Sequence, residues 1–248
     1  MKLVLNNDVL AVIDDFLELP SFEKIWNFIQ TEKFKFVHSS RWVNAFSLED
    51  GSPLWGSVTI SHPRPEACTT EQIYPTKTSI DLFINELIAR SSDYSHLIGF
   101  KDRDWDFFYA RPYLYPRGSG LSWHTDGKYK ISGAYVYYLG HKLGAELLIN
   151  PTPQLDFDYP EVTLINNKKK KVGYHLNSAE LNKYADDGIG YYIVPKPNRL
   201  VIFKNNILHC IKKVENAAGN HVRASITGFF MSNDKIHETK EAEKEHSI

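Results

Sequence analysis

The spacing of hydrophobic residues predicts two amphipathic helices near the N-terminus. Residues 8–20, "DVLAVIDDFLELP", read as a short strand and a turn into the first helix, residues 21–34, with Ser21 as its N-cap. The apolar face of the first helix is formed by Phe22, Ile25, Trp26 and Ile29. Residues 78–93 are predicted to form the second helix. Its apolar face is formed by Ile80, Phe83, Ile84, Leu87 and Ile88.

From residue 105 the pattern changes to short aromatic and β-branched runs separated by Gly, Pro, Asn and Asp. These runs are "WDFFYARPYLYP", "GAYVYYLG", "AELLINP", "YYIVP", "RLVIFKN" and "VRASITGFFM". Such runs are typical of the strands of an antiparallel β sandwich or barrel. The predicted fold class is therefore mainly β with N-terminal helices.

Three further segments are predicted to be irregular. Residues 38–76 are turn-rich and read as irregular hairpins or a long covering loop. Residues 151–190 are polar, and their run "NNKKKK" reads as a solvated loop. The charged tail from Asp234 is expected to be a surface helix or disordered.

No internal repeat divides the chain, so we expect a single domain over residues 1–248. Residues 1–104 would give helical and loop support, residues 105–231 the β core, and residues 232–248 the charged tail.

Composition adds little beyond an ordinary globular protein, with 42% hydrophobic and 24% charged residues among 248. The net charge of −1 gives no electrostatic reason to expect nucleic acid or a membrane surface as a partner. The two cysteines, Cys68 and Cys210, do not make a disulfide framework, and a cytoplasmic location is the simplest expectation. Polar residues interrupt the first sixteen positions, so no signal peptide is expected, and no later segment has the length of a membrane span. The oligomeric state stays open.

The candidate chemistry begins in "GLSWHTDGKYK", where His124 and Asp126 stand two residues apart. The triplet alone is weak evidence, because two polar residues in a turn give the same pattern. On an extended segment, however, residues i and i+2 point to the same side, so both could reach one metal ion. Two His and one carboxylate on one face form the site of non-haem Fe(II) oxygenases. His209, after "RLVIF", is the natural third ligand.

Arg223 is the candidate cation for a carboxylate-bearing cosubstrate. It lies in the apolar run "HVRASITGFF", where a buried Arg would need an anionic partner. Its guanidinium suits a carboxylate, and Ser225 lies on the same strand face. The alternative is an edge-strand Arg that faces water.

Taken as an ordered set, these segments resemble the 2-oxoglutarate- and Fe(II)-dependent oxygenases, within them the prolyl-4-hydroxylase-like group. The matching pieces within residues 105–231 are "YPRGSGLSWHTD", "YVYYLG", "LGAELLI", "VPKPNRLVIF", His209 and "RASITGFF". The opening "VLAVIDDFL" also looks like the start of that family's catalytic domain, although it is generic. The resemblance implies a double-stranded β-helix, or jelly-roll, core.

The resemblance also implies residue roles. His124, Asp126 and His209 would be the Fe(II) ligands, and Arg223 would bind the distal carboxylate of 2-oxoglutarate. Tyr138, or its neighbour Tyr137, would hydrogen-bond that carboxylate. Tyr115 would lie beside the cosubstrate, with Ser225 and Thr227 on the Arg223 strand. Ascorbate is a candidate reductant. The implied activity is a dioxygenase that hydroxylates an unactivated C–H and releases succinate and CO2.

The sequence also departs from the family pattern. Ala145 replaces the second Gly of a Gly-Gly pair, and Asn198 replaces the Gly before Arg199. The interval from His209 to Arg223 is longer than the resemblance leads us to expect, which loosens the assignment of Arg223. His221 is a second His near the site that could compete in the choice of ligand.

Three other functions stay open at this stage. A cupin-type β-barrel that binds metal or ligand without oxidation would need the triad but not Arg223. A desaturating or cyclising small-molecule oxygenase would use the same triad, whereas Asp126 argues against halogenation, because the carboxylate occupies the halide's place. A nucleic-acid demethylase would carry a second Arg six residues after Arg223, where this chain has Phe229.

The substrate is expected to be amino-acid-like, either free or in a peptide. The segment 38–76, with Trp42, Phe46 and Trp55, is expected to cover the mouth of the site. Trp105 and Trp123 are candidates for substrate contact, although core packing is the first interpretation of each. The candidates to meet a carboxylate or backbone carbonyls are Arg41, Arg64, Arg111 and Arg117.

Overall fold

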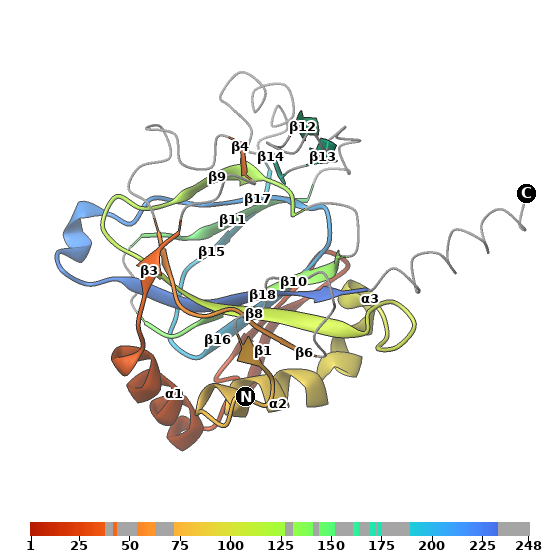
Figure 1. The fold of residues 1–248 in the computed structure, drawn as a ribbon, viewed down its shortest axis with the longest axis horizontal. Coiled ribbons are helices and arrows are strands. Elements are labelled where there is room, and N and C mark those ends of the chain that lie inside the picture. Colours follow the sequence, from red (N-terminus) through yellow and green to blue (C-terminus); the bar gives the residue numbers. More distant parts are fainter. Residues whose placement is uncertain are drawn as a thin grey trace, which may run out of the picture.

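The computed structural model describes residues 1–37, 42–43, 54–62, 72–126, 131–140, 144–151, 161–163, 169–171, 173–174 and 189–232. Two antiparallel sheets face each other, and helices cover the outer side of the larger sheet (Figure 1). The predicted mainly β class with N-terminal helices is confirmed. Among the helices of these described ranges, none has the length and apolar character needed to cross a bilayer.

The larger sheet has ten strands, with eight in the order β1-β2-β16-β10-β18-β8-β5-β3 and the short pair β6-β7 attached to β8. Its long strands are β1 (Lys2–Asn6), β2 (Leu10–Asp14), β8 (Phe107–Tyr115), β10 (Ile131–Tyr138), β16 (Arg199–Lys204) and β18 (Arg223–Met231). Its short strands are β3 (Lys35–Phe36), β5 (Trp55–Gly56), β6 (Ile60–His62) and β7 (Gln72–Ile73).

The smaller sheet has the order β15-β11-β17-β9. Its strands are β9 (Leu121–His124), β11 (Leu147–Asn150), β15 (Tyr191–Ile193) and β17 (Leu208–Ile211). Two further pairs join β12 (Glu161–Thr163) to β13 (Lys169–Lys171), and β4 (Trp42–Val43) to β14 (Gly173–Tyr174). The helices are α1 (Leu19–Thr31), α2 (Ile80–Ala89), α3 (Ser95–Ile98), and the 3-10 turns η1 (Ser91–Tyr94) and η2 (Asn216–Ala218).

Strand alternation divides the core into two layers. On β10, Tyr135 and Tyr137 pack with the helices, whereas Val136 and Tyr138 face the smaller sheet. The strands β2, β8 and β16 alternate in the same way. Both faces of the larger sheet are therefore buried, and the layer between the two sheets is where a site enclosed by both can form.

The predicted helices are confirmed, but their ends differ. α1 begins at Leu19, two residues before the predicted Ser21, with Pro20 in its first turn and Glu18 as its N-cap. Proline is favoured there because it lacks the N–H that a helix start leaves unpaired, so the Ser21 cap prediction is wrong. α2 ends at Ala89, and the predicted continuation forms η1 instead.

The segments predicted to be irregular are partly strands. Within 38–76, β5 and β6 pair with β8, so this segment extends the larger sheet where it is described. Lys169–Lys171, expected in a solvated loop, form the strand β13. Phe46, Arg41, Arg64 and the tail from Asp234 lie outside the described residues.

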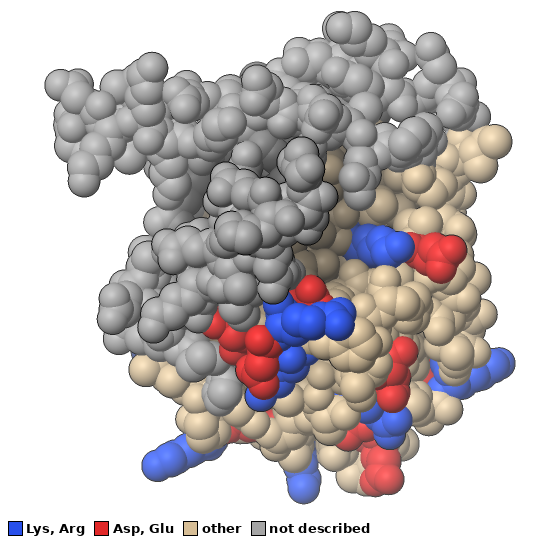
Figure 2. Space-filling model, turned by 90° about the vertical axis from the view of Figure 1, so that its right-hand side faces the viewer, with Lys and Arg blue, Asp and Glu red and all other residues tan. Residues whose placement is uncertain are grey.

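Charged side chains of both signs are interspersed over the face of the molecule in Figure 2, with neutral residues between them. No single-sign patch dominates the described part of this face, in keeping with the net charge of −1.

Asn198 and Ala145 both have left-handed backbones, with φ of 63° and 57°. Glycine adopts this conformation most easily, which accounts for the Gly expected at both positions. The Asn198 side chain offsets the strain with three hydrogen bonds. Its Oδ1 accepts from Leu17 N (2.9 Å) and Tyr137 Oη (2.8 Å), and its Nδ2 donates to Leu17 O (2.8 Å). Asn198 thereby ties the start of α1 to the end of β10.

We predict that Asn198→Ala lowers the free energy of unfolding by about 3 kcal/mol, because it removes these hydrogen bonds and keeps the strained backbone. Asn198→Gly loses the same hydrogen bonds but relieves the strain, so it should be about 1 kcal/mol less harmful. Urea denaturation of both variants measures the difference. Equal losses in both would contradict the role given to the backbone.

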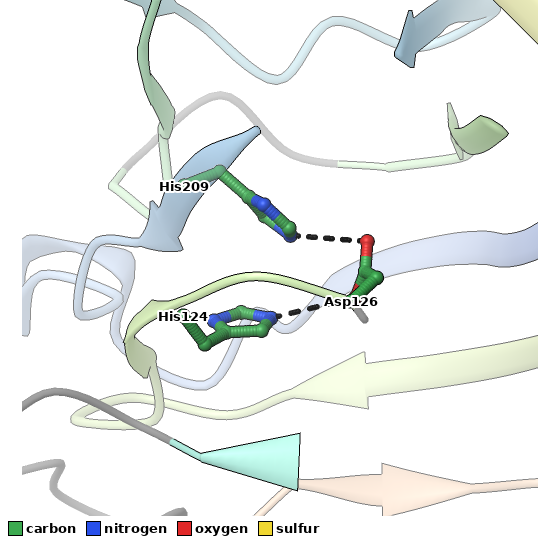
Figure 3. A group of neighbouring side chains, drawn as sticks. All are labelled: His124, Asp126 and His209. Atoms are coloured by element: carbon green, nitrogen blue, oxygen red, sulfur yellow. Dashed lines mark ion pairs between the residues drawn. The ribbon is translucent and has the colours of Figure 1, made fainter. Parts of the chain in front are cut away.

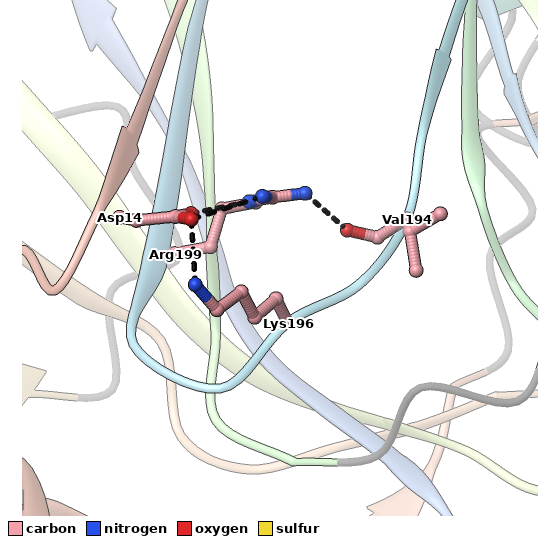
Figure 4. Close-up of polar contacts among 4 residues, drawn as sticks. All are labelled: Asp14, Val194, Lys196 and Arg199. Atoms are coloured by element: carbon pink, nitrogen blue, oxygen red, sulfur yellow. Dashed lines mark hydrogen bonds and ion pairs between the residues drawn. The ribbon is translucent and has the colours of Figure 1, made fainter. Parts of the chain in front are cut away.

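Asp14, Lys196 and Arg199 form a partly buried ion cluster that joins the end of β2 to the start of β16 (Figure 4). The Asp14 carboxylate accepts from Lys196 Nζ and from Arg199 Nε, each at 2.6 Å. Arg199 Nη1 donates to Val194 O at 2.9 Å. Burial raises the pKa of the Asp14 carboxyl, but the bonds from Arg199 and Lys196 outweigh it, so the pKa lies below its ordinary value of 3.8.

We predict that Asp14→Asn lowers the free energy of unfolding at pH 7 by about 2 kcal/mol, because charge-assisted hydrogen bonds are lost. Since the folded pKa is depressed, this contribution is complete above the unfolded pKa and disappears as the pH falls through the folded pKa. The gap between wild type and variant should therefore shrink below about pH 4. Urea titrations across this pH range test it, with the exposed Asp8→Asn as control. A gap that does not change with pH would refute it.

Candidate metal centre

His124, Asp126 and His209 converge between the two sheets (Figure 3). His124 ends β9, Asp126 lies two residues further, and His209 lies on β17 directly opposite His124. His209 is thus within a strand rather than in a loop after "RLVIF". The antiparallel pairing of β9 and β17 brings together ligands that are 85 residues apart in sequence.

The ligand atoms of the three residues all lie within 4.8 Å of one another. Asp126 Oδ1 is 3.8 Å from His124 Nε2, and Asp126 Oδ2 is 3.5 Å from His209 Nε2. Ligands on one face of an octahedral ion, each about 2.1 Å from it, would be about 3 Å apart. Small side-chain movements would therefore close the three ligands around a divalent cation.

The surroundings of His209 prepare its Nε2 for a metal. Nδ1 lies 2.8 Å from Ile207 O, and because a carbonyl only accepts, Nδ1 carries the proton and Nε2 keeps its lone pair. The Phe203 ring packs against the imidazole, with centroids 4.9 Å apart. Phe203 was not foreseen, although its position two residues after Val201 on β16 places it on the interior face.

Burial raises the pKa of the Asp126 carboxyl, and the neighbouring His209 opposes the rise. A divalent cation would favour the ionised carboxylate far more strongly than an imidazole does. His221, the competing candidate, is exposed and does not belong to this cluster.

Arg223 is fully enclosed, with 1% of its surface exposed. Its guanidinium lies over two tyrosine rings, with Cζ 4.5 Å from the centroid of Tyr115 and 4.9 Å from that of Tyr138. Within the part of the chain that the structure describes, none of its three nitrogens makes a hydrogen bond of ordinary geometry. A buried cation is costly without an anionic partner, so this position fits a bound carboxylate.

The other polar atoms around Arg223 lack partners in the same way. The side-chain oxygens of Tyr138, Ser225 and Thr227 are buried without a hydrogen bond. Burial raises the pKa of Tyr138, with Arg223 opposing the rise, and the same holds for Tyr115. Both phenols therefore stay neutral and can donate hydrogen bonds. These unsatisfied groups together fit an anionic, oxygen-rich ligand beside the triad.

The structure also separates the two candidate tyrosines of β10. Tyr137 points toward the helices, where its hydroxyl donates to Asn198 and its ring stacks on Phe83 with centroids 4.5 Å apart. Tyr138 faces the interior with Arg223. The long interval before Arg223 contains η2, and it leaves Arg223 paired with Tyr115 in the sheet register.

The remaining candidates lie in different environments. Trp105 is 1% exposed and packs on Phe230, so it is a core residue. Trp123 is partly buried, Arg117 is exposed, and Trp55 is exposed on β5, between β8 and β3. Arg111 is half-buried on β8.

Comparisons with known proteins agree with this geometry. The family model described as the 2OG-Fe(II) oxygenase superfamily matches residues 110–231. No curated protein matches the sequence. A prolyl-4-hydroxylase from Pseudomonas putida is similar over 91% of this chain and 93% of its own, at 16% identity and a TM-score of 0.51. An oxidoreductase of the 2OG-Fe(II) oxygenase family from Burkholderia pseudomallei covers 90% and 84%, at 11% identity and a TM-score of 0.54.

At these sequence identities the solved structures show only that the fold is shared, and the expected jelly-roll core is confirmed. The family model covers all three metal-ligand candidates and Arg223. Residues 110–231 of this chain therefore form a 2OG-Fe(II) oxygenase domain, and the protein is an oxidoreductase of the dioxygenase class.

Proposed function

We propose that this dioxygenase hydroxylates an unactivated C–H of an amino-acid or prolyl-type residue, free or in a peptide, and converts 2-oxoglutarate to succinate and CO2. The observation that carries the proposal is the buried Arg223 without a hydrogen-bond partner, in the same interior layer as the His124, Asp126 and His209 cluster. The prolyl-4-hydroxylase among the structural neighbours supports the substrate class by analogy of fold alone.

In this proposal, His124, Asp126 and His209 hold Fe(II), which when bound with 2-oxoglutarate supplies the oxidation of the C–H by O2. The protonated Nδ1 of His209, held by Ile207 O, keeps Nε2 directed at the metal. Asp126 supplies the carboxylate of this ligand set.

The cosubstrate carboxylate is held by Arg223. Tyr138, on β10, donates a hydrogen bond to this carboxylate. Ser225 and Thr227 offer hydroxyls from β18, the strand that carries Arg223. Tyr115 lies against the guanidinium and fixes its plane. The burial of this set excludes water, which strengthens each of these polar contacts.

A cupin-type protein that binds metal without oxidation remains the contrasting function. It gives no account of Arg223, since a guanidinium enclosed without a partner destabilises a protein that never binds an anion. Release of succinate in proportion to 2-oxoglutarate consumed separates the two functions.

We predict that His124→Ala, Asp126→Ala and His209→Ala each weaken Fe(II) binding and turnover by more than about a hundredfold, since even residues one step from a metal often cost 10–100-fold. Circular dichroism should show that each variant folds. Fe(II) bound per chain under anaerobic conditions is the direct readout. The exposed His221→Ala is the control and should bind iron normally. If His221→Ala loses iron while His209→Ala keeps it, the third ligand is misassigned.

We predict that Arg223→Leu raises the 2-oxoglutarate requirement at least tenfold, because truncating one partner of a buried charge pair costs roughly 2–5 kcal/mol. The same variant should be more stable than wild type without cosubstrate, by about 1–4 kcal/mol, because the unpaired buried charge is gone. Succinate assays and thermal unfolding measure the two effects.

Lys212→Leu is the matched control for Arg223→Leu, since Lys212 lies beside Glu146 and is half exposed. It should leave the 2-oxoglutarate requirement unchanged. An unchanged requirement in Arg223→Leu would move the cosubstrate anchor elsewhere, with Lys212 and Lys213 as the next candidates.

A further inference from the structure

A second cation, Arg111, lies on the same interior face of the larger sheet as Arg223. Along β8, Arg111 alternates with Tyr113 and Tyr115, which both belong to the core between the sheets. In the register with β18, Tyr115 pairs with Arg223 and Arg111 pairs with Thr227. Directly paired residues point to the same side of a sheet, so both guanidinium groups come from one face. At about 3.4 Å per residue, the two levels are about 13 Å apart along β8.

Burial decreases along this face from the level of Arg223 to that of Arg111. Arg223 and Tyr115 are 1% and 3% exposed, and Tyr113 is 8% exposed. Arg111 and its partner Thr227 are only partly buried. A molecule that enters from solvent therefore meets Arg111 before it reaches the enclosed end of the face.

The Arg111 side chain is positioned by contacts with uncharged groups. Nε donates to Ser57 O at 2.9 Å, and Cζ lies 5.4 Å from the centroid of the Tyr113 ring. Burial lowers the pKa of Arg111, but the neighbouring Tyr113 and Tyr109 outweigh it, so the group stays a cation. Among the residues that the structure describes, no carboxylate forms an ion pair with Arg111, and the hydroxyls of Tyr109 and Tyr113 are its neutral neighbours. Its positive charge is therefore not matched by a described group, which suits a bound anion.

Gly56 on β5 leaves the space that the Arg111 guanidinium occupies. A Cβ at position 56 would lie 2.7 Å from Arg111 Nε and 2.8 Å from its Cζ. The backbone of Gly56 does not require glycine, because its φ is not in the left-handed region. Glycine at position 56 is therefore explained by the space that the Arg111 guanidinium needs, and not by the backbone conformation.

We propose that Arg111 binds a carboxylate of the substrate, so that the substrate class is an acid such as a free amino acid or a peptide with a free C-terminus. This inference rests on the proposed function, and it narrows the substrate of the same site. Arg223 takes the cosubstrate carboxylate at the enclosed end, and Arg111 takes the substrate carboxylate nearer to solvent. A guanidinium fixed through Nε offers its two terminal nitrogens to a carboxylate as a fork.

The test compares acids with their neutral amides. Succinate formation by the Fe(II)-loaded enzyme is measured with the twenty amino acids, their carboxamides, and a proline-containing peptide with a free or an amidated C-terminus. Wild type should be stimulated by at least one acid, at least about tenfold more strongly than by its amide. Arg111→Gln and Gly56→Ala should each remove this preference and raise the KM for the acid about tenfold or more.

Two further measurements separate this role from a structural one. The affinity for 2-oxoglutarate, measured without substrate, should change less than about twofold in Arg111→Gln and in Gly56→Ala. Arg111→Lys, which keeps the charge but loses the fork, should keep part of the preference for the acid. Arg103→Gln, a change of an exposed arginine, is the control and should behave as wild type.

The possible outcomes separate the role of Arg111 from the proposed oxygenase activity. Equal stimulation by an acid and its amide, or no stimulation by any acid, overturns the role of Arg111 while the proposed oxygenase activity stands. A loss of 2-oxoglutarate affinity in Arg111→Gln also overturns it, because Arg111 would then serve the cosubstrate. If wild type with Fe(II) forms no succinate under any condition, both the proposed function and this inference fail.

Discussion

The pairing of His124 with His209 across β9 and β17 is the constraint on which the site depends. Side chains alternate between the two faces of a strand, so a slip of one residue would turn His209 outward. The pairing of β17 with β11 fixes the same register from the other side, where His209 is opposite Ile149. Asp126 then needs only to lie two residues beyond β9 to complete the cluster. Two strands of four residues thus place both histidines, and the residues directly after β9 place Asp126.

The two arginines near Tyr138 show how the protein distributes charge. Arg199 pairs with Tyr138 in the β10–β16 register, and its charge is matched within the protein by Asp14. Arg223 lies over the Tyr138 ring from β18, and its nitrogens have no hydrogen-bond partner among the described residues. The ion pair of Arg199 is satisfied within the fold, whereas the unmatched charge of Arg223 is the kind that a bound anion would stabilise. This contrast is why we propose Arg223, and not Arg199, as the cation that binds the cosubstrate.

Much of the β core and the triad could be predicted from sequence, because strand alternation and the His-x-Asp spacing are local signals. Features that depend on tertiary packing could not. Tyr137 and Tyr138 are adjacent and chemically identical, and only the arrangement of layers assigns Tyr138 to the interior. The sequence does not predict the strand β17, because "NNILHCIKKV" has no clear alternation of hydrophobic and polar residues. The pairing of β17 with β9 joins segments that are far apart in the sequence. The sequence offers Arg111 only as one of four candidate arginines, because Gly56, which leaves room for its guanidinium, is 55 residues away.

The division of the site between the two sheets has a mechanical consequence. The metal-ligand candidates come from β9, the residues after it, and β17 of the smaller sheet, whereas Arg223 and Tyr138 come from β18 and β10 of the larger one. A molecule that contacts both sets acts as a tie across the sandwich. By thermodynamic linkage, whatever opens the two layers weakens its binding, and its binding resists their separation. The distance between the two sheets should therefore fluctuate less when the site holds a ligand than when it does not, although the pairing of the strands stays the same.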